Sequence, residues 1–200
     1  MKRQKEIKSW EDGKLIAGVD EAGRGPLAGP VVACALILKP GTKIKGIKDS
    51  KLLSPKNREK LYLVIKSNAL AIGIGKVSEK MIDRLNIRKA TLLAMKRAIL
   101  KLKSKPDLVV VDGNDCPKIK LPIFSLIGAD RKVFSCACAS IIAKVERDKI
   151  MVRYHKLYPE YQFAIHKGYP TKRHKELLRR YGPSPIHRLT FTPVKEVISR

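Results

Sequence analysis

The order of its apolar segments constrains the fold of this 200-residue chain more than any other feature. Two short apolar runs, KLIAGV at 14–19 and VVACALIL at 31–38, have the length of strands and flank a glycine-rich loop. A third run, LAIGIGKV at 70–77, alternates glycine with apolar residues. Because these runs come early in the chain, they predict a meander of strands.

Helical segments alternate with the later strand-like runs. Ser54 followed by Pro55 has the pattern of an N-cap and a first helical residue, and predicts a helix through about Ser67. Apolar residues recur at helical spacing between Asn86 and Lys103. The remaining predicted elements are strands at 107–114 and 121–130, a helix around 138–147 and a basic helix at 171–181. The pattern favours a mixed sheet covered by helices.

The chain is strongly basic, with a formal net charge of +25 from 43 lysines and arginines against 18 aspartates and glutamates. Apolar residues make up 44% of the sequence, which is enough for a core, so the charge does not indicate disorder. A domain this basic most often binds a polyanion, either nucleic acid or an anionic membrane surface. No apolar run approaches the roughly 20 residues that span a bilayer. We therefore expect nucleic acid, and no membrane, as the partner.

The four cysteines and four histidines are spaced too irregularly for a disulfide framework or a zinc site. The one close pair, Cys136 and Cys138, is a C-x-C arrangement. This arrangement is typical of reduced cysteines that serve as small apolar side chains in the cytosol. The N-terminus shows no secretory signal. We therefore expect a cytoplasmic protein whose length fits one domain.

Acidic residues end three of the strand-like runs of this basic protein. They are Asp20, Glu21, Asp112 and Asp130. Because ligand sites of open α/β sheets lie beyond strand ends, these acids can converge in one place. Clustered carboxylates repel one another unless a counter-charge is present, and a divalent cation such as Mg²⁺ supplies it. The pattern therefore predicts a metal-dependent phosphodiesterase.

Each acid also has an interpretation that needs no metal. The first two acids can pair with Arg24 or cap the turn that follows them. Asp112 can open an Asp-Gly hairpin turn, and Asp115 is a rival acid nearby. Asp130 can cap the next helix. The residue pattern alone leaves these alternatives open.

Five motifs together resemble type 2 ribonuclease H, ribonuclease HII. They are GVDEAGRGPLAGPVV (18–32), DSKLLS (49–54), VDGN (111–114), ASIIAKVERD (139–148) and HKGYPT (166–171). They occur in family order, and the resemblance spans residues 14–195. It implies an α/β, ribonuclease H-like fold with a central five-stranded mixed sheet flanked by helices. Residues 1–200 would form one catalytic domain, with a core at about 14–150 and a small helical C-terminal extension at about 151–200 that contacts the hybrid.

The resemblance also implies a reaction and its substrate. Members of this family hydrolyse the RNA strand of RNA–DNA hybrids and cut 5′ of ribonucleotides embedded in duplex DNA, leaving a 3′-hydroxyl and a 5′-phosphate. We expect two divalent ions, Mg²⁺ or Mn²⁺, as cofactors, and two-metal in-line hydrolysis as the mechanism. The expected partners are RNA–DNA hybrids and ribonucleotide-containing duplex DNA, and the expected state is a monomer. Ribonucleotide removal and RNA primer processing would be the cellular role.

The resemblance assigns roles to named residues. The family's four metal-binding carboxylates fall on Asp20, Glu21, Asp112 and Asp130. The last of these is placed by counting back from ASIIAK, and Phe134 stands where proline is frequent in the family. The loop of Gly23, Arg24 and Gly25 matches the element that recognises the ribose 2′-hydroxyl and the junction phosphate.

Further substrate contacts follow from the same motifs. Tyr169 matches the tyrosine that stacks on the sugar of the following deoxynucleotide. Lys51, Ser140 and Lys144 are candidates for phosphate contact, with a surface or capping role as the alternative for each. His166 is a candidate general base, but a structural role or a contact to backbone phosphate is the preferred interpretation.

Two other functions compete with this one. A non-catalytic basic nucleic-acid-binding protein would bind duplexes without cutting them in Mg²⁺, and the cluster of acids argues against it. A metal-dependent nuclease that is indifferent to the sugar would cut all-DNA duplexes as well. A duplex with one ribonucleotide, compared with an all-DNA control, separates these functions.

Overall fold

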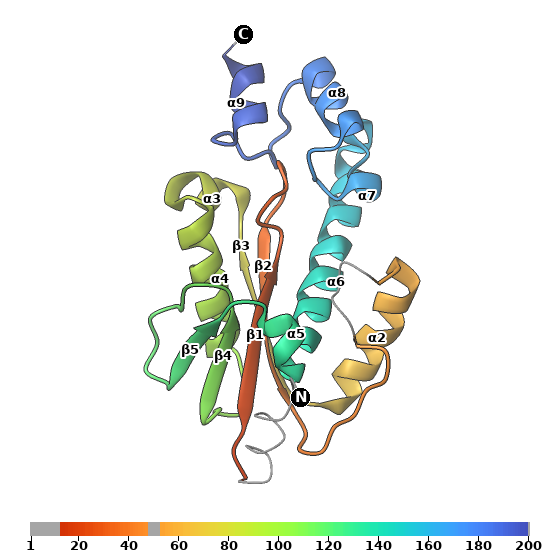
Figure 1. Cartoon of the computed structure of the whole chain (residues 1–200). Helices are drawn as coiled ribbons and strands as arrows, with labels where there is room; N and C mark the ends of the chain where they lie inside the picture. Colours follow the sequence, from red (N-terminus) through yellow and green to blue (C-terminus); the bar gives the residue numbers. More distant parts are fainter. Residues whose placement is uncertain (1–12, 48–52, 200) are drawn as a thin grey trace.

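Five strands form one mixed sheet in the order β3-β2-β1-β4-β5 in the computed structural model, which describes residues 13–47 and 53–199 (Figure 1). The strands are β1 (Ile16–Ala22), β2 (Val31–Leu38), β3 (Ala69–Val77), β4 (Leu108–Asp112) and β5 (Ile123–Leu126). The first three form an antiparallel meander, whereas β4 runs parallel to both β1 and β5. The predicted five-stranded mixed sheet is therefore confirmed.

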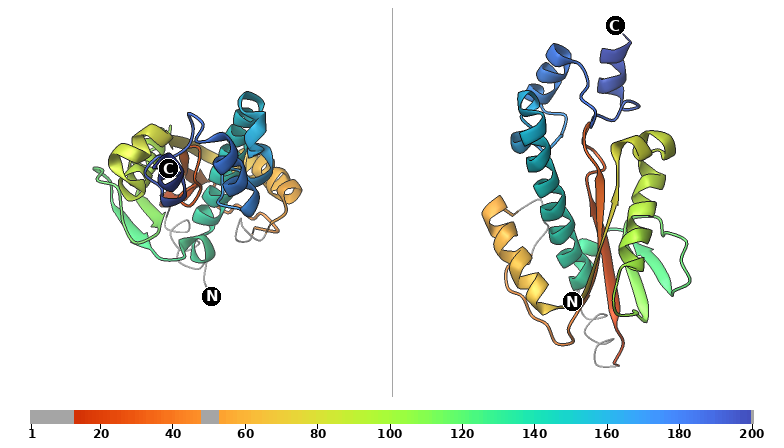
Figure 2. Two further views of the ribbon diagram at one scale, coloured as in Figure 1. Left: turned by 90° about the horizontal axis from the view of Figure 1, so that it is seen from above. Right: turned by 180° about the vertical axis from the view of Figure 1, so that it is seen from behind.

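Helices cover both faces of the sheet (Figure 2). The principal helices are α2 (Pro55–Asn68), α3 (Glu79–Leu85), α4 (Ile87–Leu100) and α6 (Phe134–Leu157). The side chain of Ser54 accepts a hydrogen bond from the Asn57 N–H, which confirms the predicted start of α2. The short helix α3 was not predicted, because seven residues are too few to show a helical period.

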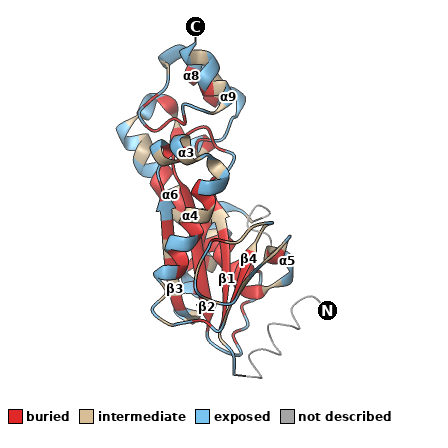
Figure 3. Ribbon diagram, turned by 90° about the vertical axis from the view of Figure 1, so that its left-hand side faces the viewer, coloured by how far each residue is buried: buried red, intermediate tan, exposed pale blue. Residues whose placement is uncertain are grey.

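Strand β2 lies inside the sheet with both of its faces covered. All of its residues are buried, as expected for a strand that reads as a continuous apolar run. One set of alternating side chains, including Ala33 and Ala35, packs toward α4, and the other set, including Cys34 and Leu36, packs toward α2 and α6. Figure 3 shows this buried centre between the exposed outer faces of the helices.

Strand β3 and helix α4 lie unusually close together because β3 carries glycine where the two meet. A Cβ atom added to Gly75 would lie 1.9 Å from the carbonyl oxygen of Ala94, and one added to Gly73 would lie 2.0 Å from that of Ala98. Both contacts are to helix backbone, which cannot move aside as a flexible side chain would. The small residues of the two elements therefore set their spacing.

We expect the substitution Gly75→Ala to lower the free energy of unfolding by at least about 2 kcal/mol, because the added methyl group forces β3 away from α4. Urea unfolding followed by circular dichroism measures the change. An unchanged unfolding midpoint would show that β3 and α4 are not packed closely enough to exclude a methyl group.

The C-terminal part contains one short 3₁₀ helix and three α-helices in the described residues. They are η2 (Pro159–Tyr161), α7 (Phe163–His166), α8 (Lys172–Tyr181) and α9 (Thr192–Ile198). The predicted basic helix at 171–181 corresponds to α8, with Thr171 as its N-cap. Helix α6 continues to Leu157, across the boundary expected at about 150.

The connection between β1 and β2 packs against this C-terminal part (Figure 1). The N–H of Leu27 donates to the carbonyl of Gly168, and the N–H of Gly29 donates to that of Ile186, each at 2.8 Å. The N–H of Arg188 donates in turn to the carbonyl of Leu27 at 2.8 Å. The glycine-rich loop is therefore held by segments more than a hundred residues away in the sequence.

Two local predictions about the acids differ from the structure. Asp20 and Glu21 lie within β1 rather than after it, because the pairing with β2 continues to Ala22. The strand predicted at 121–130 extends only over Ile123–Leu126, so Asp130 lies on the short helix α5 (Ala129–Lys132) rather than at a strand end. Arg147 of α6 is fully buried, because the β1–β2 connection and the segment at Lys167 cover its side of the helix. No helix in the described ranges is long and apolar enough to cross a membrane.

Candidate active site

A cleft of about 410 Å³ lies at the carboxyl ends of β1 and β4. It is lined by Asp20, Glu21, Ala22, Gly23, Arg24, Gly25, Asp112, Gly113, Asp130, Ser140, Lys144 and Tyr169. Ten of the eleven predicted site residues are in this set, and the remaining one, Lys51, lies outside the described residues. The chain therefore brings together residues that are up to 149 positions apart, from Asp20 to Tyr169.

The parallel pairing of β1 with β4 explains why two of the acids meet. Val19 is opposite Val111 in the register, so Asp20 and Asp112 follow at the same edge of the sheet. Successive residues of a strand point to opposite faces, and Asp20 therefore points toward α6 whereas Glu21 does not. On the α6 side, the hydroxyl of Ser140 forms a hydrogen bond with Asp20.

The pKa of Asp20 is raised well above its ordinary value. Burial is the largest cause, since this side chain is only 7% exposed, and the charges of Glu21 and Asp112 add to it. Hydrogen bonds from Ser140 and from the Glu21 N–H, the latter 2.6 Å long, oppose the shift only in part. A cation at this position would relieve both causes.

Glu21 is only partly satisfied within the protein. Its Oε1 atom accepts a hydrogen bond from Arg24 at 3.4 Å, whereas Oε2 is buried without a partner among the described residues. Burial raises the pKa of Glu21, Arg24 lowers it, and Asp112 raises it again. The alternative pairing with Arg24 is thus observed, but it leaves one carboxylate oxygen available to another ligand.

Asp112 has a role that the sequence did not reveal. Its Oδ1 atom accepts a hydrogen bond from the N–H of Ala129 at 2.8 Å, so Asp112 holds the first turn of α5 (Ala129–Lys132), on which Asp130 lies. The parallel arrangement of β4 and β5 rules out a hairpin turn at Asp112. Asp130 is not a helix cap either, since Gly128 occupies the N-cap position.

The rival acid Asp115 lies outside the cleft. Arg88 of α4 donates two hydrogen bonds of 2.8 Å to its carboxylate. This bidentate pair satisfies both carboxylate oxygens and lowers the pKa of Asp115. The acid is therefore engaged with the helix rather than with the predicted site.

The carboxylates fit a divalent ion that takes few protein ligands. In the described part of the chain, no three His, Cys, Asp or Glu side chains already stand as a complete ligand set for one ion. The donors are nevertheless hard carboxylate oxygens, and the Oε2 atom of Glu21 has no partner among the described residues. The pKa values of Asp20 and Glu21 are raised by burial and by the charges of neighbouring carboxylates. Mg²⁺ and Mn²⁺ complete such shells with water and substrate phosphate.

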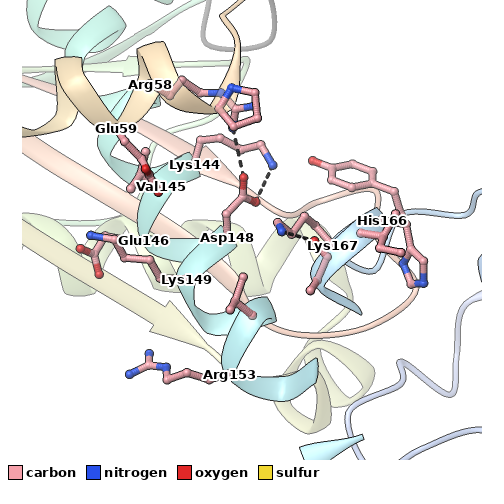
Figure 4. A pocket seen from close by; sticks show the side chains of 15 residues that line it. Arg58, Glu59, Lys144, Val145, Glu146, Asp148, Lys149, Arg153, His166 and Lys167 are labelled. Atoms are coloured by element: carbon pink, nitrogen blue, oxygen red, sulfur yellow. Dashed lines mark hydrogen bonds and ion pairs between the residues drawn. The ribbon is translucent and has the colours of Figure 1, made fainter. Parts of the chain in front are cut away.

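A larger groove of about 870 Å³ adjoins the cleft along α2, α6 and α7 (Figure 4). The two hollows share Lys144 and Tyr169. In the groove, Asp148 accepts hydrogen bonds from Arg58 at 3.1 Å and from Lys144 at 2.5 Å. Asp148 is thus neutralised by two cations and is not available to a metal ion. The smaller cleft is lined by four carboxylates and is therefore the candidate active site.

His166 does not line the cleft, and both of its ring nitrogens are engaged within the protein. Gly168 donates its N–H to Nδ1 at 3.1 Å, so Nε2 carries the proton and donates to the carbonyl of Tyr161 at 2.7 Å. Burial lowers the pKa of His166. These contacts favour the structural interpretation of this residue over the general-base interpretation.

A model of the ribonuclease HII family matches residues 17–194. The chain belongs to the ribonuclease HII family. It is 51% identical to the ribonuclease HII of Idiomarina loihiensis over 185 residues, which are 92% of this chain and 99% of the relative. The protein is therefore a ribonuclease H-type endonuclease, a hydrolase of a family that depends on divalent metal ions.

Solved structures agree with the sheet and its helices. The ribonuclease H2 of Pyrococcus horikoshii OT3 matches with a TM-score of 0.79 and 30% identity, covering 93% of this chain and 98% of that one. Bst-RNase HIII in complex with Mn²⁺ has a TM-score of 0.77 at 19% identity, over 93% of this chain and 70% of the other. The latter likeness shows the fold alone, and together they confirm the ribonuclease H-like architecture.

Proposed function

We propose that this ribonuclease HII cuts 5′ of ribonucleotides embedded in duplex DNA and hydrolyses the RNA strand of RNA–DNA hybrids, leaving a 3′-hydroxyl and a 5′-phosphate. One observation carries the proposal: the four carboxylates and the loop of Gly23, Arg24 and Gly25 line the same cleft. A phosphate at the carboxylates would therefore have its neighbouring sugar at the loop.

The loop provides a reason for preferring ribose over deoxyribose. Gly25 has open space where a side chain would be, and Gly23 adopts a φ of +102°, which favours glycine. A sugar can therefore approach the loop backbone closely enough for a hydrogen bond to its 2′-hydroxyl, the group that separates RNA from DNA. The side chain of Arg24 is 56% exposed and can reach an adjacent phosphate.

The acids would hold the metal ions that the reaction needs. Asp20, Glu21, Asp112 and Asp130 are the proposed ligands, and bound Mg²⁺ or Mn²⁺ would supply an activated water and stabilise the charge that develops on the phosphate. Mn²⁺ is present in the Bst-RNase HIII complex of the same fold. Without such ions, the carboxylates would repel the phosphodiester substrate.

Three further residues are proposed to position the substrate. The ammonium group of Lys144 lies 5.5 Å from the centre of the Tyr169 ring, so a cation and an aromatic face stand together at the edge of the cleft. Tyr169 can stack on a sugar while Lys144 contacts a phosphate. Ser140 instead hydrogen bonds to Asp20 and would orient that carboxylate.

The basic surface and the cellular setting complete the proposal. Many cations of the C-terminal part, such as Arg173, Lys175 and Arg179, are available to track the phosphate backbone, and binding should weaken steeply with salt. We further propose that the protein acts as a cytoplasmic monomer in ribonucleotide removal and RNA primer processing. The expected substrates are RNA–DNA hybrids and ribonucleotide-containing duplex DNA.

A duplex containing one ribonucleotide tests the proposed function, with an all-DNA duplex of the same sequence as the control. We expect metal-dependent cutting only on the 5′ side of the ribonucleotide, because the loop requires the 2′-hydroxyl. Denaturing electrophoresis with end-labelled strands maps the cut. Equal cutting of both duplexes would indicate a sugar-indifferent nuclease, and binding without cutting would indicate a non-catalytic binding protein.

A further inference from the structure

Two buried arginines hold the β1–β2 connection, residues 23–30, which contains the loop proposed to recognise the sugar. Arg188, from the segment between α8 and α9, is 0% exposed. Its guanidinium donates to the carbonyls of Gly23 at 2.6 Å, Arg24 at 3.0 Å and Gly29 at 2.8 and 3.0 Å. A planar group with donors on three nitrogens thus joins the loop to Gly29, further along the β1–β2 connection.

Arg147 of α6 holds the later part of the same β1–β2 connection. It is also 0% exposed, and it donates to the carbonyls of Ala28 at 3.0 Å, Pro30 at 3.0 Å and Lys167 at 2.9 Å. A Cβ atom on Gly23 would lie 2.2 Å from the Nε atom of Arg147. The loop can lie this close to the guanidinium only because residue 23 lacks a side chain.

The contacts with Arg188 orient the backbone carbonyls of the loop toward the protein interior. The carbonyls of Gly23 and Arg24 point inward to Arg188, whereas within the described residues the N–H groups of Arg24 and Gly25 donate to no backbone carbonyl of a turn or loop. These amides belong to residues that line the cleft. The loop therefore offers backbone donors toward the place where a ribose oxygen or a phosphate would lie.

Both arginines keep their charge at neutral pH. Burial lowers the pKa of Arg147 to about 10 and that of Arg188 to about 9, both well above 7. Within the described ranges, each guanidinium is bonded to carbonyl oxygens and forms no ion pair with a carboxylate. Two buried positive charges behind the loop would favour the approach of an anionic phosphate to its front.

We propose that Arg188 is a positioning residue for sugar discrimination: it fixes the carbonyls of Gly23 and Arg24 inward so that the loop amides face the ribose 2′-hydroxyl and its phosphate. The C-terminal segment is then part of the specificity apparatus, and not only a surface for duplex binding. This inference rests on the proposed function, because it concerns how the same loop distinguishes the two sugars.

The substitution Arg188→Lys tests the inference because it keeps the charge and the aliphatic stem but cannot span the three carbonyls. Affinities for the single-ribonucleotide duplex and the all-DNA duplex are measured by fluorescence anisotropy with Mg²⁺, in an Asp20→Asn background so that no substrate is consumed. We expect the preference for the ribonucleotide duplex to fall at least about tenfold, while affinity for the all-DNA duplex stays within about twofold.

A second readout follows the loop directly. In ¹⁵N-labelled protein, the amide resonances of Gly23 and Gly25 should shift or broaden in Arg188→Lys, whereas those of the β1 interior should not. If the lysine variant does not fold, Arg188→Gln, which keeps a planar donor group, is measured in the same way. The matched control is Arg97→Lys, which makes the same exchange on α4. The guanidinium of Arg97 donates to the carbonyl of Lys76 in β3 at 2.7 Å.

The outcomes separate the two proposals. If the protein that retains Arg188 shows no preference for the ribonucleotide duplex, the proposed function itself fails, and the positioning role fails with it. If that preference exists and a folded Arg188 variant keeps it, with unshifted loop amides, the positioning role is overturned. A loss of preference in Arg97→Lys as well would also overturn it, because the effect would then not require contact with the loop.

Discussion

Asp20→Asn is expected to lower metal-dependent cleavage at least about 10³-fold while leaving the fold intact, since a metal-assisted step supplies several kcal/mol of charge stabilisation. Asparagine has nearly the same shape and can still accept the hydrogen bond from the Glu21 N–H. It removes the most buried of the four carboxylates, on which the charges of Glu21 and Asp112 both act. Single-turnover cleavage of the single-ribonucleotide duplex measures the loss.

The same substitution should stabilise the metal-free protein. Burial and two neighbouring carboxylates both disfavour the ionised form of Asp20, so a side chain that is always neutral avoids both costs. Adding Mn²⁺ should raise the melting temperature of the unsubstituted protein, because the ion binds only the folded cleft, and should raise that of Asp20→Asn much less. Differential scanning calorimetry with and without the metal measures both effects.

Asp115→Asn is the matched control for the loss of activity. It removes an equally charged residue close to Asp112 in the sequence, but one that is paired with Arg88 outside the cleft. We expect its cleavage rate to stay within about threefold of the unsubstituted protein. Full activity in Asp20→Asn, or an equal loss in Asp115→Asn, would contradict the proposed ligand set.

Lowering the pH should destabilise the protein through three histidines of the C-terminal part, His166, His174 and His187, whose rings stack or hydrogen bond with one another. Ser184 donates its N–H to Nδ1 of His187 at 2.9 Å, so the proton of His187 is on Nε2, which lies 3.0 Å from Nε2 of His174. His174 then donates from Nδ1 to the carbonyl of Tyr169 at 2.9 Å. His166 stacks on His174 with ring centroids 4.2 Å apart. The arrangement requires every ring to be neutral.

Burial is the largest cause that lowers the pKa of His174 to about 4 and that of His187 to about 3. In the unfolded chain both groups titrate near 6.5, so the unfolded state binds more protons below that pH. Their stabilising contribution is therefore complete above about pH 6.5 and is lost as the pH falls toward 4. We expect the free energy of unfolding to drop by about 3–5 kcal/mol between pH 7 and pH 4.5.

Urea unfolding at a series of pH values measures this loss. His187→Asn keeps an acceptor for the Ser184 N–H and removes one titrating ring, so it should be less stable at pH 7.5 and show a shallower dependence on pH. Asp20 and Glu21 act in the opposite direction, because their raised pKa values favour the folded state as the pH falls. The dependence should therefore be steeper in Asp20→Asn, and a pH-independent midpoint would contradict the neutral-histidine arrangement.

Local patterns in the sequence were sufficient for most of the elements. The run at 31–38 became β2 without a change of boundary, and the Ser54–Pro55 pattern marked the start of α2. Both signals depend on neighbouring residues, because apolar alternation and N-capping act over a few positions. The extension of β1 through Asp20 and Glu21 could not be predicted in this way, since it depends on pairing with β2.

The sequence by itself determined the family, the acids and the glycine-rich loop, because their residue types and spacing are local and specific. The tertiary structure alone decided how these parts are held: Asp112 accepts a hydrogen bond from the α5 backbone, Arg147 donates to the carbonyl of Ala28, and Arg188 donates to that of Gly23. These contacts join residues 17 to 165 positions apart. No periodicity in a chain encodes such partners, and an arginine that is fully buried has the same sequence signal as one on the surface.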